Sequence, residues 1–293
     1  MKTIVTGGHG CIGSSIKRGI KIGRKDVDLL NLEKTISFFK EKKPDIIIHA
    51  AAKQGNYSNM NSEKVEHFTE NMRMTMNVFE AAKESGVKKL IALSTTTAFP
   101  HELSGKASEK DLFSGETHPT CYSHGYAKRM FEVLCRSYRE QYGLEFTCLF
   151  LSNVYGPGFS EENGVIPFLI EKCKHAKDSK TLLDFMGKGE QTRDFIYVDD
   201  VIKVVDKIIE YDNFPYSSLI VSSGEEIKIR DILFLVCKNL NFDVENINWI
   251  SSENLGQMRK VFSNSRLTST FPDISFTNIL EGIGLTIEGR KQD

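Results

Sequence analysis

Thr6-Gly7-Gly8-His9-Gly10-Cys11-Ile12-Gly13 follows the β-branched segment Thr3 to Val5 and leads into the start of a predicted helix. Within it, Gly7, Gly10 and Gly13 are spaced as GxxGxxG. Glycines at this spacing allow a tight turn, close approach of the backbone to a pyrophosphate, and close packing of the helix on a sheet. The phosphates then lie at the helix N-terminus, where free N–H groups and the helix dipole favour anions. The stretch therefore predicts a dinucleotide-binding turn, with a purely structural turn as the alternative.

Short β-branched runs alternate with helix-length segments through the first half of the chain, and the second half is less regular. Parallel strands that are buried on both faces read as near-continuous apolar runs, and β-α-β alternation implies right-handed crossovers. The pattern predicts an α/β fold, a Rossmann-type doubly wound parallel sheet with a smaller interleaved C-terminal lobe. The predicted strands are Thr3 to Val5, Gly19 to Ile22, Asp45 to His49, Lys89 to Leu93, Phe146 to Leu151 and Phe195 to Val198. The predicted helices are Met72 to Glu84, Tyr126 to Tyr142, Val165 to Lys177, a helix capped by Asp199-Asp200 that ends at Glu210, and Ile227 to Leu240, with a turn-rich loop from Asn153 to Gly158.

Composition excludes several classes of function. The chain has 293 residues and a formal net charge of -1, which does not suggest a nucleic-acid partner. No apolar stretch approaches membrane-spanning length, so no membrane association is expected. The six cysteines are scattered without a CxxC pair, which argues against a zinc site or a disulfide framework. With no signal-like N-terminus, we expect a cytoplasmic protein without a bound metal.

The end of the second strand bears on the choice of cofactor. Gly23-Arg24-Lys25 stands where an acidic residue would bind the ribose 2′-hydroxyl of NAD. A basic pair suits a 2′-phosphate instead, so the segment favours NADP(H), with a solvated basic pair as the alternative. The first helix is unusually short in sequence, so we expect the adenosine end of the site to be open.

Several further segments carry a resemblance to a known family. They include PDIIIHAAAKQG at 44–55, STTTAFP at 94–100, YSHGYAKRM at 122–130, NVYGP at 153–157, GVIPFLI at 164–170, GKGEQTRDFIYVDD at 187–200 and GQMRK at 256–260. With the glycine turn, they make the chain resemble an extended short-chain dehydrogenase/reductase of the NAD-dependent epimerase/dehydratase family, and within it the GDP-L-fucose synthase group. The resemblance implies a Rossmann domain at 1–155 that also receives 190–222, and a nucleotide-sugar lobe formed by 156–189 and 223–293. It implies cofactor contacts from Gly7, Gly10, Cys11, Ile12, Gly13, Arg24, Ala51, Ala52 and Lys128.

The resemblance also implies catalytic and substrate-binding roles. Thr95, with Thr96 as a close rival, would hydrogen-bond the substrate carbonyl, and a tyrosine would protonate its oxygen. Lys128 would hold the nicotinamide ribose and lower the tyrosine pKa. The implied substrate contacts are Thr97, Asn153, Arg193 and Arg259; the alternatives are a turn asparagine at Asn153 and surface salt bridges at the two arginines.

The tyrosine is out of place in Tyr122-Ser123-His124-Gly125-Tyr126-Ala127-Lys128. Neighbours on one helix face lie three or four residues apart, and four residues before Lys128 stands His124. Tyr122 could reach the site only if Gly125 made the helix entry irregular. Three readings stay open: Tyr122 as proton donor, His124 as an imidazolium donor, or little catalysis. Tyr126 is expected to be a packing residue.

Two further positions depart from the GDP-L-fucose synthase group, which epimerises two carbons beside the ketone before reducing it. The resemblance places the epimerising cysteine at Thr97 and the histidine at Gly164. We therefore predict NADPH-dependent reduction of a 4-keto nucleotide sugar, GDP-linked, without the epimerase step. The alternatives are a full epimerase-reductase, another nucleotide-sugar epimerase or dehydratase, and a catalytically silent NADP(H)-binding protein. The expected partners are the nucleotide sugar and a second copy of the chain, with a homodimer formed through the helices at 72–84 and 126–142.

Overall fold

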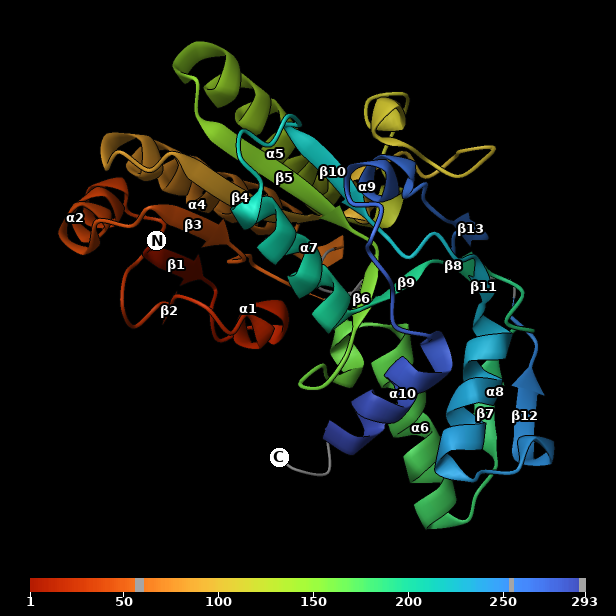
Figure 1. Cartoon of the computed structure of the whole chain (residues 1–293). Coiled ribbons are helices and arrows are strands. Elements are labelled where there is room, and N and C mark those ends of the chain that lie inside the picture. Colours follow the sequence, from red (N-terminus) through yellow and green to blue (C-terminus); the bar gives the residue numbers. More distant parts are fainter. Residues whose placement is uncertain (56–60, 253–255, 290–293) are drawn as a thin grey trace.

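Six parallel strands form the central sheet, in the order β10-β5-β4-β3-β1-β2 (Figure 1). The computed structural model describes residues 1–55, 61–252 and 256–289. The strands of this sheet are β1 (Thr3–Thr6), β2 (Ile20–Ile22), β3 (Ile46–His49), β4 (Lys89–Thr95), β5 (Glu145–Leu151) and β10 (Ser218–Val221). The predicted Rossmann-type sheet is confirmed.

The strand order reverses at β1, which pairs with β2 on one side and with β3 on the other. In open α/β sheets, ligands bind outside the carboxyl ends of the strands at such a switch point. Here those ends are Thr6, His49 and Thr95 on β1, β3 and β4. The topology therefore places the glycine turn that follows β1 at the centre of this edge.

Helices cover both faces of the sheet, as alternation of the strand side chains requires. Ile47 packs with the face that holds α2 (Leu32–Lys42), α4 (Lys64–Glu84) and α5 (Tyr122–Tyr142). Ile46 and Ile48 face the opposite side, with α7 (Val198–Glu210) and α9 (Ser265–Thr270). The short α1 (Cys11–Ser15) lies beside α7 (Figure 1).

A second apolar cluster forms the smaller lobe at the carboxyl edge of the sheet (Figure 1). The lobe contains α6 (Val165–Ser179), α8 (Ile229–Leu240), α10 (Ile279–Gly289) and the parallel pair β7 (Leu183–Met186) and β12 (Ile247–Ile250). Short strands join it to the main sheet: β6 (Asn153–Tyr155) pairs with β9 (Phe195–Tyr197), and β8 (Thr192–Arg193) lies between β11 (Ile227–Lys228) and β13 (Arg259–Lys260). The 3₁₀ helices are η1 (Thr96–Ala98), η2 (Glu109–Asp111), η3 (Pro119–Cys121), η4 (Glu161–Asn163) and η5 (Val244–Asn246). A smaller lobe is present as expected, while its exact boundaries stay a prediction.

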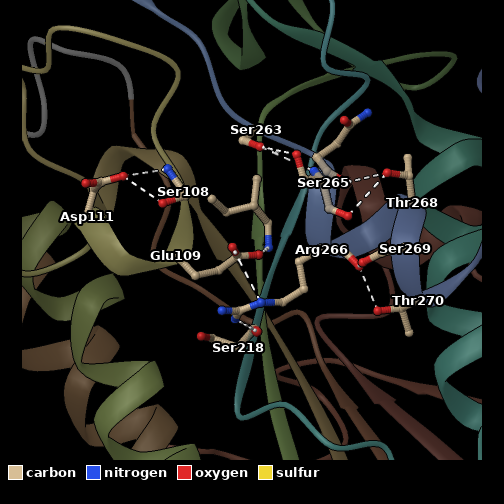
Figure 2. Close-up of polar contacts among 12 residues, drawn as sticks. Ser108, Glu109, Asp111, Ser218, Ser263, Ser265, Arg266, Thr268, Ser269 and Thr270 are labelled. Atoms are coloured by element: carbon tan, nitrogen blue, oxygen red, sulfur yellow. Dashed lines mark hydrogen bonds and ion pairs between the residues drawn. The ribbon is translucent and has the colours of Figure 1, made fainter.

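Polar contacts protect the edge strand β10, as Figure 2 shows. The Glu109 carboxylate on η2 accepts the Ile220 N–H at 2.9 Å and lies 3.6 Å from the Arg266 guanidinium on α9. Arg266 also donates to the Ser218 carbonyl at 3.1 Å. An open sheet edge invites pairing with another chain, and these side chains occupy it instead.

Several predicted boundaries are wrong for identifiable reasons. α4 begins at Lys64 rather than Met72, because its first two turns are largely polar and carry little apolar periodicity. The predicted loop at Asn153 is strand β6, and Ile227-Lys228 is strand β11 rather than helix; both pair with segments distant in sequence. Asp199 and Asp200 lie in the first turn of α7 and do not cap it, since the Asp200 carboxylate accepts the Thr277 N–H at 2.7 Å.

Among the described residues, no helix is both long and apolar enough to cross a membrane.

Candidate active site

A cavity of about 1040 Å³ lies between the carboxyl edge of the sheet and the smaller lobe. The segments after β1, β3 and β4 line it, together with the start of α5 and most of residues 151–168. Its volume is at the upper end of the range for small-molecule and cofactor sites. The cavity therefore has room for an extended ligand, or for two ligands side by side.

The glycine turn forms one wall of this cavity, and its geometry explains its glycines. Gly7 has φ +64, and a Cβ there would lie 2.6 Å from the Ala51 nitrogen. A Cβ on Gly13 would collide with the Gly7 carbonyl oxygen. Gly10 caps α1 without a side chain, so N–H groups of the first turn have no intrahelical partner and are available to an anion. These residues fit the pyrophosphate of a dinucleotide.

All the residues predicted to contact the cofactor line this one cavity. They are Gly7, Gly10, Cys11, Ile12, Gly13, Arg24, Ala51, Ala52 and Lys128. α1 has only five residues, which confirms the expected short first helix.

The loop after β2 favours a 2′-phosphate. Arg24 is exposed and lines the cavity. The nearby carboxylates serve local turns: Asp26 accepts the Gly23 N–H at 2.8 Å, and Asp28 accepts the Leu30 N–H at 3.0 Å. Lys25, the second basic residue of the pair, does not line the cavity.

Lys128 on α5 is buried and lines the cavity. The Ser94 hydroxyl at the end of β4 donates to the Lys128 carbonyl at 2.9 Å and ties the helix to the strand. The Lys128 side chain is 2% exposed, and its Nζ lies 4.3 Å from the centroid of the Phe131 ring. Burial lowers the Lys128 pKa to about 8. The amine is thus held ready for a hydroxyl-rich or anionic ligand.

The first turn of α5 is a regular helix that begins at Tyr122, not at Tyr126 as predicted. The irregular entry that Tyr122 would need is therefore not present. Gly125 has a different role: a Cβ there would lie 2.9 Å from the Thr97 carbonyl oxygen and 3.0 Å from the Thr117 Cβ. The glycine lets α5 pack directly against η1, the 3₁₀ turn that follows β4, and against Thr117.

The regular helix separates the two candidate proton donors. Tyr122 is 45% exposed, does not line the cavity, and has the Lys64 ammonium 5.5 Å from its ring centroid. His124 is 2% exposed and lines the cavity beside Lys128. Of its ring nitrogens, Nδ1 is fully enclosed without a hydrogen-bond partner among the described residues. The structure thus brings His124, Lys128 and Thr95 together and leaves Tyr122 outside.

The protonation state of His124 differs from the imidazolium considered in the sequence analysis. Burial, and then the nearby Lys128 charge, lower the His124 pKa to about 3. The imidazole is therefore neutral at pH 7. A neutral imidazole N–H can still donate a hydrogen bond to a carbonyl oxygen and polarise it, as in the triosephosphate isomerase pattern.

Tyr126 packs on the surface with Glu116, which accepts its hydroxyl, and with the Arg129 guanidinium, 4.8 Å from its ring centroid. This agrees with the packing role predicted for it.

A hydrogen-bonded row of side chains crosses the floor of the cavity. The Lys260 ammonium donates to the Thr97 hydroxyl at 3.2 Å, and the Thr97 and Thr95 hydroxyls lie 3.2 Å apart. The Thr97 N–H donates to the Thr95 hydroxyl oxygen, also at 3.2 Å. Thr96, the rival of Thr95, is 2% exposed and does not line the large cavity.

Two of the four predicted substrate contacts line the cavity and two do not. Thr97 and Asn153 line the cavity, with the Asn153 amide donating to the Asp194 carbonyl at 2.6 Å. Arg193 and Arg259 do not line it. Arg259 forms a two-point ion pair with Glu226 at 2.8 and 2.7 Å, and it lines a small neighbouring cavity of about 20 Å³.

Three polar residues at or beside the site were missed in the sequence. Cys121 and Lys260 line both cavities, and His67 on α4 lies behind His124. Cys121 directly precedes the Tyr122 segment and Lys260 directly follows Arg259, so both could have been suspected from the candidate residues beside them. His67 is 61 residues distant from Lys128 in a polar helical turn and gave none.

A doubly wound sheet, a glycine turn at its switch point and a threonine–lysine pair around one cavity define a dinucleotide-binding protein of the short-chain dehydrogenase/reductase type. Residues 3–218 match the NAD dependent epimerase/dehydratase family. GDP-L-fucose synthase from Dictyostelium discoideum is 37% identical over 298 residues, covering 96% of this chain and 92% of that protein. The chain therefore belongs to the NAD dependent epimerase/dehydratase family.

Solved structures agree in fold. The NADP-bound GDP-L-fucose synthetase from Naegleria fowleri is similar with a TM-score of 0.87 and 27% identity, over 98% of this chain and 91% of that one. The NADP-bound GDP-mannoheptose C4 reductase from Campylobacter jejuni is similar in fold with a TM-score of 0.87 at 22% identity, over 98% of each chain.

Proposed function

We propose that this protein reduces the 4-keto group of a nucleotide sugar with NADPH, and that the sugar is GDP-linked. The observation that carries the proposal is one cavity lined by the glycine turn, Thr95, His124 and Lys128. The similar GDP-sugar enzymes, and the NADP bound in two of the similar solved structures, support it.

The residues of the site divide the chemistry among them. Bound NADPH would supply the hydride that the carbonyl carbon accepts. The glycine turn would hold the pyrophosphate, Arg24 the 2′-phosphate, and Lys128 the nicotinamide ribose. The carbonyl oxygen then needs one proton, which the N–H of neutral His124 would give; the imidazolate left behind would take a proton back from water.

Thr95 would orient the carbonyl through its hydroxyl. Its oxygen already accepts the Thr97 N–H, and Thr97 in turn accepts from Lys260. If the Thr97 hydroxyl donates to Thr95, the Thr95 proton is free to point into the cavity. The row therefore favours Thr95 as a donor to the substrate oxygen.

The two described positions that the resemblance assigns to the epimerising acid and base carry no suitable side chain. Thr97 and Gly164 both line the cavity, but a threonine hydroxyl is a very poor base and glycine has no side-chain group. The two cavity thiols do not replace them, since burial raises the pKa of Cys11 and of Cys121. We therefore propose a reductase without the epimerase step.

The test is steady oxidation of NADPH, followed by absorbance, with GDP-4-keto-6-deoxymannose as substrate. We expect one NADPH consumed per substrate reduced. An epimerase or dehydratase recycles its cofactor and would convert the sugar without net oxidation. Thermal stabilisation by NADPH with no conversion of any GDP-4-keto sugar would instead identify a silent binding protein.

We also propose a cytoplasmic homodimer. Val65, Phe68 and Met76 on α4 are exposed, and α4 packs against α5 to form an outer layer of one face. Light scattering coupled to size-exclusion chromatography would test the dimer, and a monomer mass would contradict it.

A further inference from the structure

Two buried histidines are in contact at the cavity: His124 lines it, and His67, which does not, packs against His124. His67 on α4 is 0% exposed, and its ring centroid lies 6.0 Å from that of His124 on α5, with the ring planes at 79°. Both nitrogens of His67, and Nδ1 of His124, are enclosed without a hydrogen-bond partner among the described residues. The fourth nitrogen, Nε2 of His124, is not among the enclosed atoms, and His124 lines the cavity.

Such atoms call for an explanation, because buried polar groups in proteins are nearly always paired. Several other polar groups near His124 are engaged elsewhere, although the buried Ser123 hydroxyl, next to His124 in the chain, also lacks a hydrogen-bond partner among the described residues. Lys260 on β13 donates to Thr97, and the Lys128 amine lies over the Phe131 ring. His49 on β3, whose pKa is lowered by burial and then by the Lys128 charge, contacts Thr6 at 2.8 Å and Thr75 at 3.2 Å through its two ring nitrogens. Among the described residues, His67 is the one whose ring packs edge-on against the His124 ring while both of its nitrogens lack a partner.

A neutral imidazole has one donor nitrogen and one acceptor nitrogen, and a hydrogen bond at one decides the role of the other. We propose that His67 is a positioning residue that donates an N–H to Nδ1 of His124 when ligands fill the cavity. This bond would hold His124 in the tautomer that presents its Nε2–H to the substrate oxygen. The rings would have to move closer as well as rotate, because their centroids lie 6.0 Å apart and no nitrogen pair is within hydrogen-bond distance. The proposal rests on the proposed function, in which His124 is the proton donor; His67 itself does not touch substrate.

Nitrogen-15 NMR of histidine-labelled protein with NADP⁺ and GDP tests the tautomer without any turnover. The His124 signals are assigned by their loss in His124→Gln. We expect Nε2 to be the protonated nitrogen of His124 in the wild type, and a mixture of tautomers in His67→Phe. Protonation at Nδ1 of His124 in the wild type, or an unchanged tautomer in His67→Phe, would overturn the proposal.

Kinetics supply the second arm. For His67→Phe we expect kcat for NADPH oxidation to fall roughly 10- to 100-fold with little change in KM, as for other residues that orient a reacting group. His67→Gln, whose amide can donate, should recover part of the loss. His175→Phe, at an exposed position, is the matched control and should change neither constant. Equal kcat in wild type and His67→Phe refutes the positioning role, whereas an inactive wild type with the expected tautomer refutes the proposed function alone.

Discussion

Replacing Lys128 by methionine is expected to make the protein more stable and to weaken reduction strongly. Burial lowers the Lys128 pKa in the folded protein to about 8, from an ordinary value of 10.5. Below pH 8 the amine is charged in both states, so the folded state carries the whole desolvation cost. Between pH 8 and 10.5 the folded protein loses the proton first, so that cost fades as pH rises, and above this window it is absent.

The pKa difference sets the magnitude. It corresponds to roughly 3 kcal/mol of lost stability at pH 7, since each pKa unit is 1.36 kcal/mol. The Phe131 ring under the ammonium offsets about 1 kcal/mol of this through a cation–π contact. The variant should therefore be more stable by about 2 kcal/mol at pH 7, which for a chain of this length raises Tm by about 3 °C.

Thermal melts at pH 7 and pH 10 measure this directly, alongside NADPH oxidation. The gap between the variant and the wild type should shrink to within about 1 kcal/mol at pH 10. The variant should lose about 100-fold or more in kcat/KM, because Lys128 would no longer hold the cofactor. Lys25→Met, at an exposed position outside the cavity, is the control and should show no pH-dependent gap. A Lys128→Met protein that melts below the wild type at pH 7, or a gap that is equal at both pH values, refutes this account of the buried amine.

Gly125→Ala should lower Tm by about 2 °C, because overpacking against Thr97 outweighs the gain of about 1 kcal/mol in helix propensity. Gly105→Ala, with open space around it, is the control. A Tm of Gly125→Ala equal to that of the wild type contradicts the packing role. Arg24→Ala should weaken NADPH binding about 10-fold or more and leave NADH binding unchanged, as calorimetric titration would show, since a charge-assisted hydrogen bond is worth about 1.5–3 kcal/mol; an equal loss for both cofactors contradicts it. In deuterium oxide, C3 and C5 of the keto-sugar should not exchange faster than without enzyme, and rapid exchange by mass spectrometry would show that epimerisation survives.

Much of the nucleotide half could be predicted because its signals are local. The apolar runs and the glycine turn predicted the sheet, and each predicted cofactor residue lines the cavity. Helical spacing also placed His124 on the Lys128 face. The structure differs from the prediction at Gly125. A glycine in a sequence can mark either a break in a helix or a close contact with a neighbouring element. Here it marks a close contact with the Thr97 carbonyl, which belongs to another element and is not apparent from the local sequence.

The smaller lobe was harder because its short strands pair over long sequence distances. β8 is held between β11 and β13, and no local pattern shows this. The same distance hid the Arg259–Glu226 ion pair, which takes Arg259 out of the large cavity. His67 could not be recognised in the sequence for a related reason, because its proposed role depends on the His124 ring, which belongs to a different helix.

The central claim is that His124, and not Tyr122, protonates the substrate oxygen. The most direct measurement compares NADPH oxidation with GDP-4-keto-6-deoxymannose by His124→Phe and Tyr122→Phe, both checked for NADPH binding. The account predicts that kcat falls roughly 10²- to 10⁴-fold in His124→Phe, the range for a lost general acid, and stays within about twofold in Tyr122→Phe. A large loss in Tyr122→Phe with near-normal turnover in His124→Phe would contradict it.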